Sequence, residues 1–300
     1  MPTPEGSAYV SATSSDALTA GLTTAAGLRA QVAERVRGKL DLPLLPQVAG
    51  QVLVLAGSPN VDALALSGLI HRDPALAGQV LRIANSPAYM PRMPIVSLQQ
   101  AVARLGLQTV TEIAIAASLQ SGTFRVPGHE KELKRLWRHA IASGAFAKEI
   151  ARLLRVNVET AFLCGLFHAI GKPAVLQVIC DVQREHGGVT VGSAEVWALL
   201  EEFHTPVGLV LAKHWALSTP VVSSVGYHAR YDEAPTARQE ATLTCLADRL
   251  ATNLIDPQPG FDDALRGDRV LADLNLYPDA VTRLLDLRPV VARTVESMTT

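Results

Sequence analysis

The sequence is short of the features that mark several large classes of protein. Aromatic residues make up 5% of its 300 residues and charged residues 18%, while 27 Lys and Arg nearly balance 28 Asp and Glu to give a net charge of -1. A dedicated nucleic-acid-binding surface needs a clear excess of Lys and Arg to neutralise phosphates, so near neutrality argues against one. It also leaves no electrostatic attraction to an anionic membrane surface.

Cysteines and long apolar runs are scarce as well. The three cysteines, Cys164, Cys180 and Cys245, form no Cys-x-x-Cys pair, which is typical of small buried side chains in a reducing compartment. No run of about 18 uninterrupted apolar residues is present, as a membrane-spanning helix would need. Residues 1–26 are rich in Ser, Thr, Ala, Gly and Pro and lack the pattern of a secretory signal. We expect a cytoplasmic protein with a disordered N-terminal tail and no membrane contact.

The residues that are abundant favour helices. Hydrophobic residues make up 48% of the chain, with many Ala, Leu and Val, and Ala and Leu lose little on entering a helix. Asp73-Pro74 and Ser97 are helix start signals, because each supplies a capping side chain. The chain shows no internal repeat, and residues 188–191 are the only strand-like stretch. The sequence therefore predicts an all-α fold.

Breaks in the pattern divide this helical fold into parts. Pro127-Gly128 marks the junction of two helical lobes, and a second break near 257–260 precedes further amphipathic turns. We expect a tail over 1–26, a first lobe over 27–126, a second lobe over 127–255 and a helical extension over 256–300.

Four of the eight histidines lie in apolar helical surroundings: His139, His168, His204 and His228. A buried imidazole needs a partner, because an unpaired buried polar group costs on the order of 1–3 kcal/mol. Together with Asp248, which lies in an apolar run, they suggest a shared metal site. The alternative is that each ring hydrogen-bonds a backbone carbonyl, and no i, i+4 pair on one helix decides between the two. The remaining histidines are expected on the surface or at helix ends: His71, His129, His186 and His214.

Several stretches closely resemble the HDOD domain, an HD-related output domain of bacterial signalling proteins. The most specific are residues 73–86 (DPALAGQVLRIANS) and 97–106 (SLQQAVARLG), and the others lie at 137–140, 162–172, 201–208 and 226–228. The resemblance covers roughly residues 40–254. It implies a helical N-terminal lobe packed on a lobe related to HD-type metal-dependent phosphohydrolases.

The resemblance also implies roles for single residues. His139 matches the first metal-ligand histidine of catalytic HD proteins, and His168 matches the histidine of their His-Asp pair. His204 and His228 resemble the additional histidines of the HD-GYP class, which hydrolyses cyclic dinucleotides. Two further matches are Asp248 with the distal aspartate, and Lys172 with a lysine that can approach a phosphate.

The chain departs from the catalytic pattern at Ala169. Catalytic HD proteins have His-Asp-Ile-Gly-Lys, whereas this chain has His-Ala-Ile-Gly-Lys at 168–172. A carboxylate at this position can bridge two metal ions and fix the attacking water, and a methyl group can do neither. We therefore expect a degenerate site without catalytic residues. It would need no cofactor and hold at most one weakly bound Zn, Fe or Ni ion, for which imidazoles with one carboxylate are suitable ligands.

These features predict a non-catalytic bacterial signalling protein that binds a regulatory protein partner in trans. The alternatives are a metal-dependent phosphohydrolase of nucleotides or cyclic dinucleotides, and a sensor that binds such nucleotides without turnover. The turn-rich loop 85–94 is the expected interaction surface, and a purely structural connection is its alternative. Four loop residues are its candidates: Asn85, Tyr89, Met90 and Met93.

Overall fold

The computed structural model of the chain describes residues 25–38, 40–56, 62–91, 93–186 and 191–299, and every regular element within them is a helix. The all-α prediction is confirmed for these residues. The predicted tail, 1–26, lies outside the described residues except for Ala25 and Ala26, which begin the helix α2 (Ala25–Arg37). The strand-like stretch 188–191 also lies outside them except for Val191.

Five consecutive helices form the first lobe: α3 (Gln47–Ala56), α4 (Ala63–Ile70), α5 (Pro74–Ala84), α6 (Leu98–Leu105) and α7 (Leu107–Gln120). Helices α3, α5 and α6 pack on α7, which is buried over most of its length. The two predicted helix starts are confirmed. The Asp73 carboxylate accepts the amide of Leu76 at 3.0 Å, and the Ser97 hydroxyl accepts the amide of Gln100 at 3.2 Å. Each cap satisfies an amide that the first helical turn leaves free.

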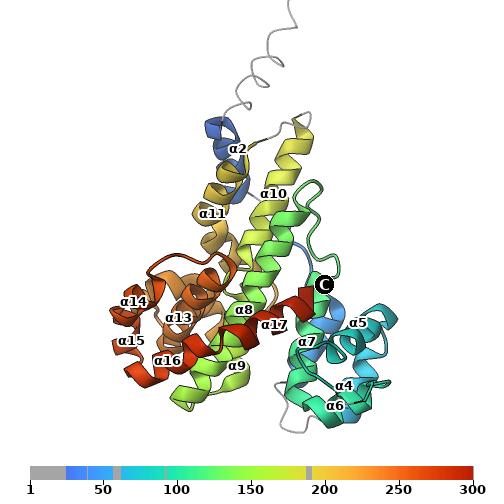
Figure 1. Ribbon diagram of the computed structural model, residues 1–300. Helices are drawn as coiled ribbons and strands as arrows, with labels where there is room; N and C mark the ends of the chain where they lie inside the picture. Colours follow the sequence, from blue (N-terminus) through green and yellow to red (C-terminus); the bar gives the residue numbers. More distant parts are fainter. Residues whose placement is uncertain (1–24, 39, 57–61, 92, 187–190, 300) are drawn as a thin grey trace, which may run out of the picture.

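The second lobe is built around one long helix, α8, which runs through the middle of the molecule (Figure 1). Its elements are α8 (Glu130–Leu154), α9 (Val158–Phe167), α10 (Gly171–Glu185), α11 (Ser193–His214), α12 (Thr219–Tyr227), the 3-10 helix η1 (His228–Glu233) and α13 (Arg238–Ile255). Helix α9 packs tightly on α8, since a Cβ atom on Gly165 would lie 2.5 Å from the Ser143 carbonyl oxygen. A Cβ atom on Gly171 would overlap the His204 carbonyl oxygen. These two close approaches set the end of α9 against α8, which carries His139, and the start of α10 against α11, which carries His204.

The two ends of the described chain both pack on the second lobe. The extension forms α14 (Phe261–Arg266), α15 (Arg269–Asp273), α16 (Pro278–Asp286) and α17 (Arg288–Thr299). Helix α17 lies across α8 and reaches α7, so it contacts both lobes (Figure 1). Helix α2 packs on α10 and α11, although it falls within the boundaries 27–126 assigned to the first lobe. The amphipathic pattern of a short helix does not indicate which lobe receives it.

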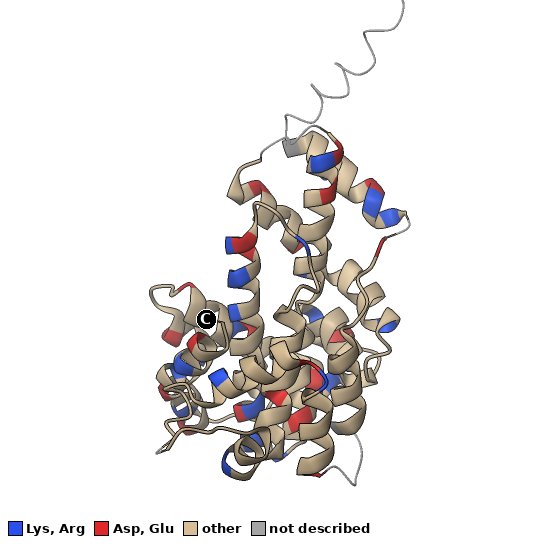
Figure 2. Ribbon diagram, turned by 90° about the vertical axis from the view of Figure 1, so that its right-hand side faces the viewer, with Lys and Arg blue, Asp and Glu red and all other residues tan. Residues whose placement is uncertain are grey.

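Charge and hydropathy agree with a fold of packed helices. Acidic and basic residues are interspersed along the helices, as Figure 2 shows. One segment of the described residues, Val158–Glu185, is long and apolar enough to cross a membrane by length and composition alone. It consists of α9 and α10, and 78% of its most apolar window is buried inside the fold, as is usual for core helices.

A buried ion pair joins the two lobes. Lys148 on α8 donates to both carboxylate oxygens of Glu112 on α7, at 2.6 and 2.8 Å. The two side chains are only 14% and 8% exposed. Burial raises the pKa of the Glu112 carboxyl, and the Lys148 charge offsets this only in part. The pair therefore depends on Lys148, since the carboxylate alone would be a buried, uncompensated charge.

Replacement of Lys148 by methionine tests this dependence. We expect Lys148→Met to lower the free energy of unfolding at neutral pH by roughly 3–5 kcal/mol, because it leaves the buried carboxylate unpaired. The loss should shrink as the pH falls, because a carboxyl whose folded-state pKa is raised favours its protonated form in the folded protein. Urea unfolding at several pH values measures both effects. The double variant Glu112→Leu/Lys148→Met should recover most of the stability, and equal instability of the single and double variants would contradict this interpretation.

Candidate metal-binding site

Three of the predicted site residues converge from three different helices. His139 lies in the middle of α8, His168 directly follows α9, and Asp248 lies on α13. One Asp248 oxygen, Oδ1, is 3.1 Å from Nε2 of His139 and 3.1 Å from Nε2 of His168. The potential ligand atoms of the three residues all lie within 4.8 Å of one another. This spacing is compact enough for one metal ion to contact all three.

The other two predicted histidines extend this group into a row of four rings. The ring centroids of His139 and His168 are 5.3 Å apart, those of His168 and His228 4.8 Å, and those of His204 and His228 5.7 Å. His168, His204 and His228 are buried, and His139 is partly exposed. The structure thus brings together all five residues that the apolar sequence context and the resemblance pointed to. We call them the histidine cluster.

Backbone carbonyls fix the orientation of three of these rings. Nδ1 donates to the Gly165 carbonyl at 2.7 Å in His168, to the Glu201 carbonyl at 2.9 Å in His204, and to the Ser224 carbonyl at 3.0 Å in His228. Because a carbonyl only accepts, Nδ1 carries the proton, and Nε2 of the neutral ring keeps its lone pair. Metal-binding histidines are held in the same way. Three of the four rings therefore bond a backbone carbonyl, as one interpretation of the sequence expects, and all four rings also converge.

This arrangement leaves two acceptors facing each other. Nε2 of neutral His168 and Oδ1 of Asp248 both carry lone pairs, yet they lie 3.1 Å apart. A cation resolves the conflict, either as a second proton on His168 or as a metal ion between the two atoms. The donor set of two imidazoles and one carboxylate fits a single Zn, Fe or Ni ion.

The electrostatics of the cluster favour an ionised Asp248 and neutral rings at His139, His204 and His228. Burial by itself raises the pKa of Asp248, but the hydrogen bonds from His139 and His168 outweigh it and hold that pKa well below its ordinary value. Burial, together with the nearby His168, lowers the pKa of His228 to about 3. Burial also lowers the pKa values of His139 and His204. A carboxylate and neutral imidazoles are the protonation states that bind metal ions.

Two of the predicted site positions, Ala169 and Lys172, follow His168 along the chain. Ala169 is buried, with 7% of its surface exposed, and offers only a methyl group. Lys172 lies close enough to the cluster to lower the pKa values of His139 and His204. Its ammonium group donates to Glu201 Oε1 at 2.6 Å, so a carboxylate already compensates the charge that was predicted to meet a phosphate.

Three polar neighbours of the cluster were not singled out from the sequence: Glu201, Thr205 and Thr252. The Thr252 hydroxyl is 3.2 Å from His139 Nε2, and the Thr205 hydroxyl is 3.2 Å from His204 Nε2. Thr252 follows Asp248 by four residues on α13, a spacing that puts both on one helix face. That spacing is the signal that could have identified it.

The four remaining histidines differ from one another. His71 and His214 are exposed, and Nδ1 of His186 donates to the Val182 carbonyl near the end of its helix. His129 lies at a helix end, as predicted, at the N-cap position of α8. Its side chain is 13% exposed, makes no cap hydrogen bond, and lies 3.1 Å from Gln183 on α10.

The loop 85–94 combines structural and exposed residues. The Asn85 amide donates to the Ile95 carbonyl and its oxygen accepts the Ile95 amide, both at 2.8 Å, so Asn85 closes the loop. Tyr89 is partly buried, and burial together with the Glu112 charge raises its pKa. Met90 and Met93 are 75% and 66% exposed. Of the four predicted residues, these two are the ones that a partner could reach.

The fold and the histidine cluster together define an all-helical protein with a group of candidate metal ligands in its second lobe. The HDOD domain model matches residues 42–231, and the chain belongs to the HDOD domain family. This confirms the resemblance seen in the sequence.

The relatives of known sequence or structure are distant. An uncharacterised protein of Treponema pallidum is 23% identical over 250 residues, covering 80% of this chain and 47% of its own length, so the chain spans about half of that relative. An HDOD domain protein of unknown function from Geobacter sulfurreducens is 20% identical with a TM-score of 0.70, over 92% of this chain and 99% of its own. A candidate phosphohydrolase from Shewanella amazonensis is 21% identical with a TM-score of 0.65, over 90% and 98%. These structures show that the fold is shared.

Metal-dependent stabilisation tests the ligand set. If Zn²⁺ binds the folded chain and not the unfolded chain, it should raise the free energy of unfolding of the protein. The rise should be roughly 2.7 kcal/mol when the free Zn²⁺ concentration is a hundredfold above the Kd. We expect the rise in wild type and in the control His129→Gln, and its loss in His168→Ala and Asp248→Asn. Thermal unfolding with and without Zn²⁺ measures it. An equal rise in wild type and both cluster variants would show that Zn²⁺ binds elsewhere.

Proposed function

We propose that this chain is a non-catalytic, cytoplasmic signalling protein that acts by binding a regulatory protein in trans. In this proposal the histidine cluster is an inherited metal pocket that holds at most one ion. The observation that carries it is Ala169, a buried methyl group beside His168, where the catalytic HD pattern has a carboxylate.

The missing carboxylate matters because of what a two-metal hydrolase requires. Two ions that clamp the attacking and leaving oxygens need carboxylate ligands able to bridge them. Within the part of the chain that the structure describes, Asp248 is the single carboxylate of the ligand group. Its Oδ1 already faces both His139 and His168. A single bound ion would act as a Lewis acid, and here His139, His168 and Asp248 would hold it and thereby tie α8, α9 and α13 together.

A metal-dependent phosphohydrolase of nucleotides or cyclic dinucleotides is the second candidate. The convergence of His139, His168 and Asp248 favours it, because these ligands remain in place. The ion pair of Lys172 with Glu201 counts against it and against a nucleotide sensor, because the lysine charge is already compensated.

A turnover assay separates the first two candidates. Purified wild type, loaded with Mn²⁺, Fe²⁺ or Zn²⁺, should hydrolyse cyclic dinucleotides and mononucleotides no faster than His168→Ala, which lacks a central ligand. Product formation is followed by chromatography. Wild-type hydrolysis that disappears in His168→Ala would refute the non-catalytic function.

The partner would meet the exposed part of the loop 85–94. Methionine side chains are flexible and polarisable, which suits them to contact with a protein surface. Asn85 and the partly buried Tyr89 would hold Met90 and Met93 in place.

Site-specific photo-cross-linking in cells tests this surface. A photoreactive residue at Met90 should cross-link a defined signalling protein, whereas the same residue at Tyr277, which is also 75% exposed, should not. Mass spectrometry identifies the product. The same proteins captured from both positions, or none from Met90, would exclude this loop as the docking surface.

A further inference from the structure

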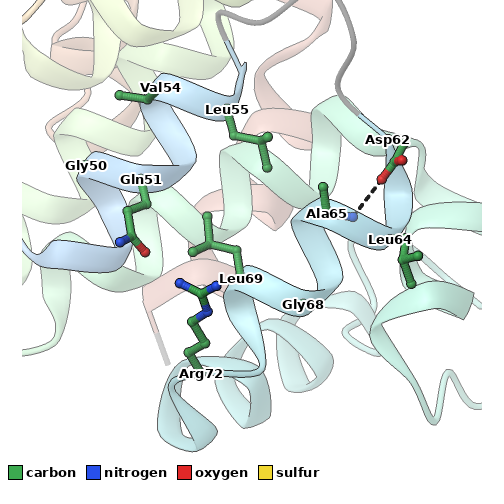
Figure 3. A pocket seen from close by; sticks show the side chains of 10 residues that line it. All are labelled: Gly50, Gln51, Val54, Leu55, Asp62, Leu64, Ala65, Gly68, Leu69 and Arg72. Atoms are coloured by element: carbon green, nitrogen blue, oxygen red, sulfur yellow. Dashed lines mark hydrogen bonds between the residues drawn. The ribbon is translucent and has the colours of Figure 1, made fainter.

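The first lobe carries an open groove of about 700 Å³ between α3 and α4, outside the histidine cluster (Figure 3). Val54 on α3 and Leu64 on α4 line it, and they are 78% and 69% exposed. Large apolar side chains gathered at a groove mark a surface that another molecule covers.

Gly68 lines the same groove in the interior of α4. It is exposed, and a Cβ atom added to it would meet nothing within 4 Å. Glycine in the interior of a helix is less favourable than alanine, so the fold itself gives no reason for it. A second helix lying closely on α4 would give one.

Opposite charges stand at the two ends of the groove. Asp62 precedes α4 and Arg72 follows it, and Figure 3 shows them at opposite ends. The two positions are ten residues apart, which is about 15 Å along a helix and too far for a pair within one chain. Arg72 is exposed and forms no ion pair with any described residue. The groove therefore offers the unpaired positive charge of Arg72 at one end and the negative charge of Asp62 at the other, at a fixed separation.

We infer that the groove is a dimer interface in which the α4 helices of two copies of this chain lie antiparallel about a two-fold axis. A two-fold axis makes each contact occur twice, with the two ends exchanged. Arg72 then faces the partner subunit's Asp62 at both ends. In this register Leu64 and Gly68, one helical turn apart on the same face, come close across the axis, so that the leucine of each copy packs near the partner subunit's Gly68. Charge and shape are thus both self-complementary, which identifies a second copy as the occupant.

Sedimentation velocity over a wide range of protein concentrations tests the interface. Wild type should form a concentration-dependent dimer, whereas Gly68→Gln should be monomeric because its side chain fills the groove. The matched control is Gly78→Gln on α5, where an added Cβ atom also meets nothing within 4 Å, and it should dimerise like wild type. A monomeric wild type at every concentration, or a Gly68→Gln variant that still dimerises, would overturn the inference.

Charge exchange tests the proposed register. Arg72→Glu and Asp62→Arg should each be monomeric alone, because each homodimer would place like charges together at both ends. An equimolar mixture should form a heterodimer, because both ends then pair opposite charges. A mixture that stays monomeric, although circular dichroism shows both chains folded, would overturn this register. None of these residues belongs to the histidine cluster, so Zn²⁺ stabilisation should persist in every variant, and failure of the dimer leaves the proposed function unaffected.

Discussion

Asp248 places one carboxylate oxygen 3.1 Å from Nε2 of both His139 and His168, and this shared contact joins α8, α9 and α13. His168 is turned toward it because the Gly165 carbonyl holds its Nδ1 atom. A bound cation at this site would compensate the partly buried carboxylate. The close approach of α9 to α8 at Gly165 brings His168 near His139, and both rings can then reach Asp248 on α13.

In the proposed function, this geometry would hold one metal ion without hydrolysis. Ligation of one ion requires only the three converging side chains, whereas two-metal chemistry requires the carboxylate that Ala169 lacks. Helix α8 also links the cluster to the first lobe. His139 and Lys148 lie on it nine residues apart, about 14 Å along the helix, and Lys148 holds Glu112 of the first lobe. The cluster and the ion pair between the lobes are thus connected by one helix.

Local features of the fold could be predicted, and those that depend on distant packing could not. The caps at Asp73 and Ser97 follow from side-chain chemistry within one turn. The apolar context of the four histidines made them candidates. No two of them share a helix at ligand spacing, so only the resemblance gave them roles in one metal site. The docking of α2 on the second lobe has no local signal. The pairing of Lys172 with Glu201 also joins separate helices, which no spacing along the chain reveals.

The central claim is that Ala169 leaves a pocket for one ion and no hydrolytic site. The most direct measurement is the number of metal ions per chain, counted by inductively coupled plasma mass spectrometry after loading with Zn²⁺ or Mn²⁺ and removal of free metal. The account predicts at most one ion in wild type and none in His168→Ala. Two tightly held ions per wild-type chain would contradict it.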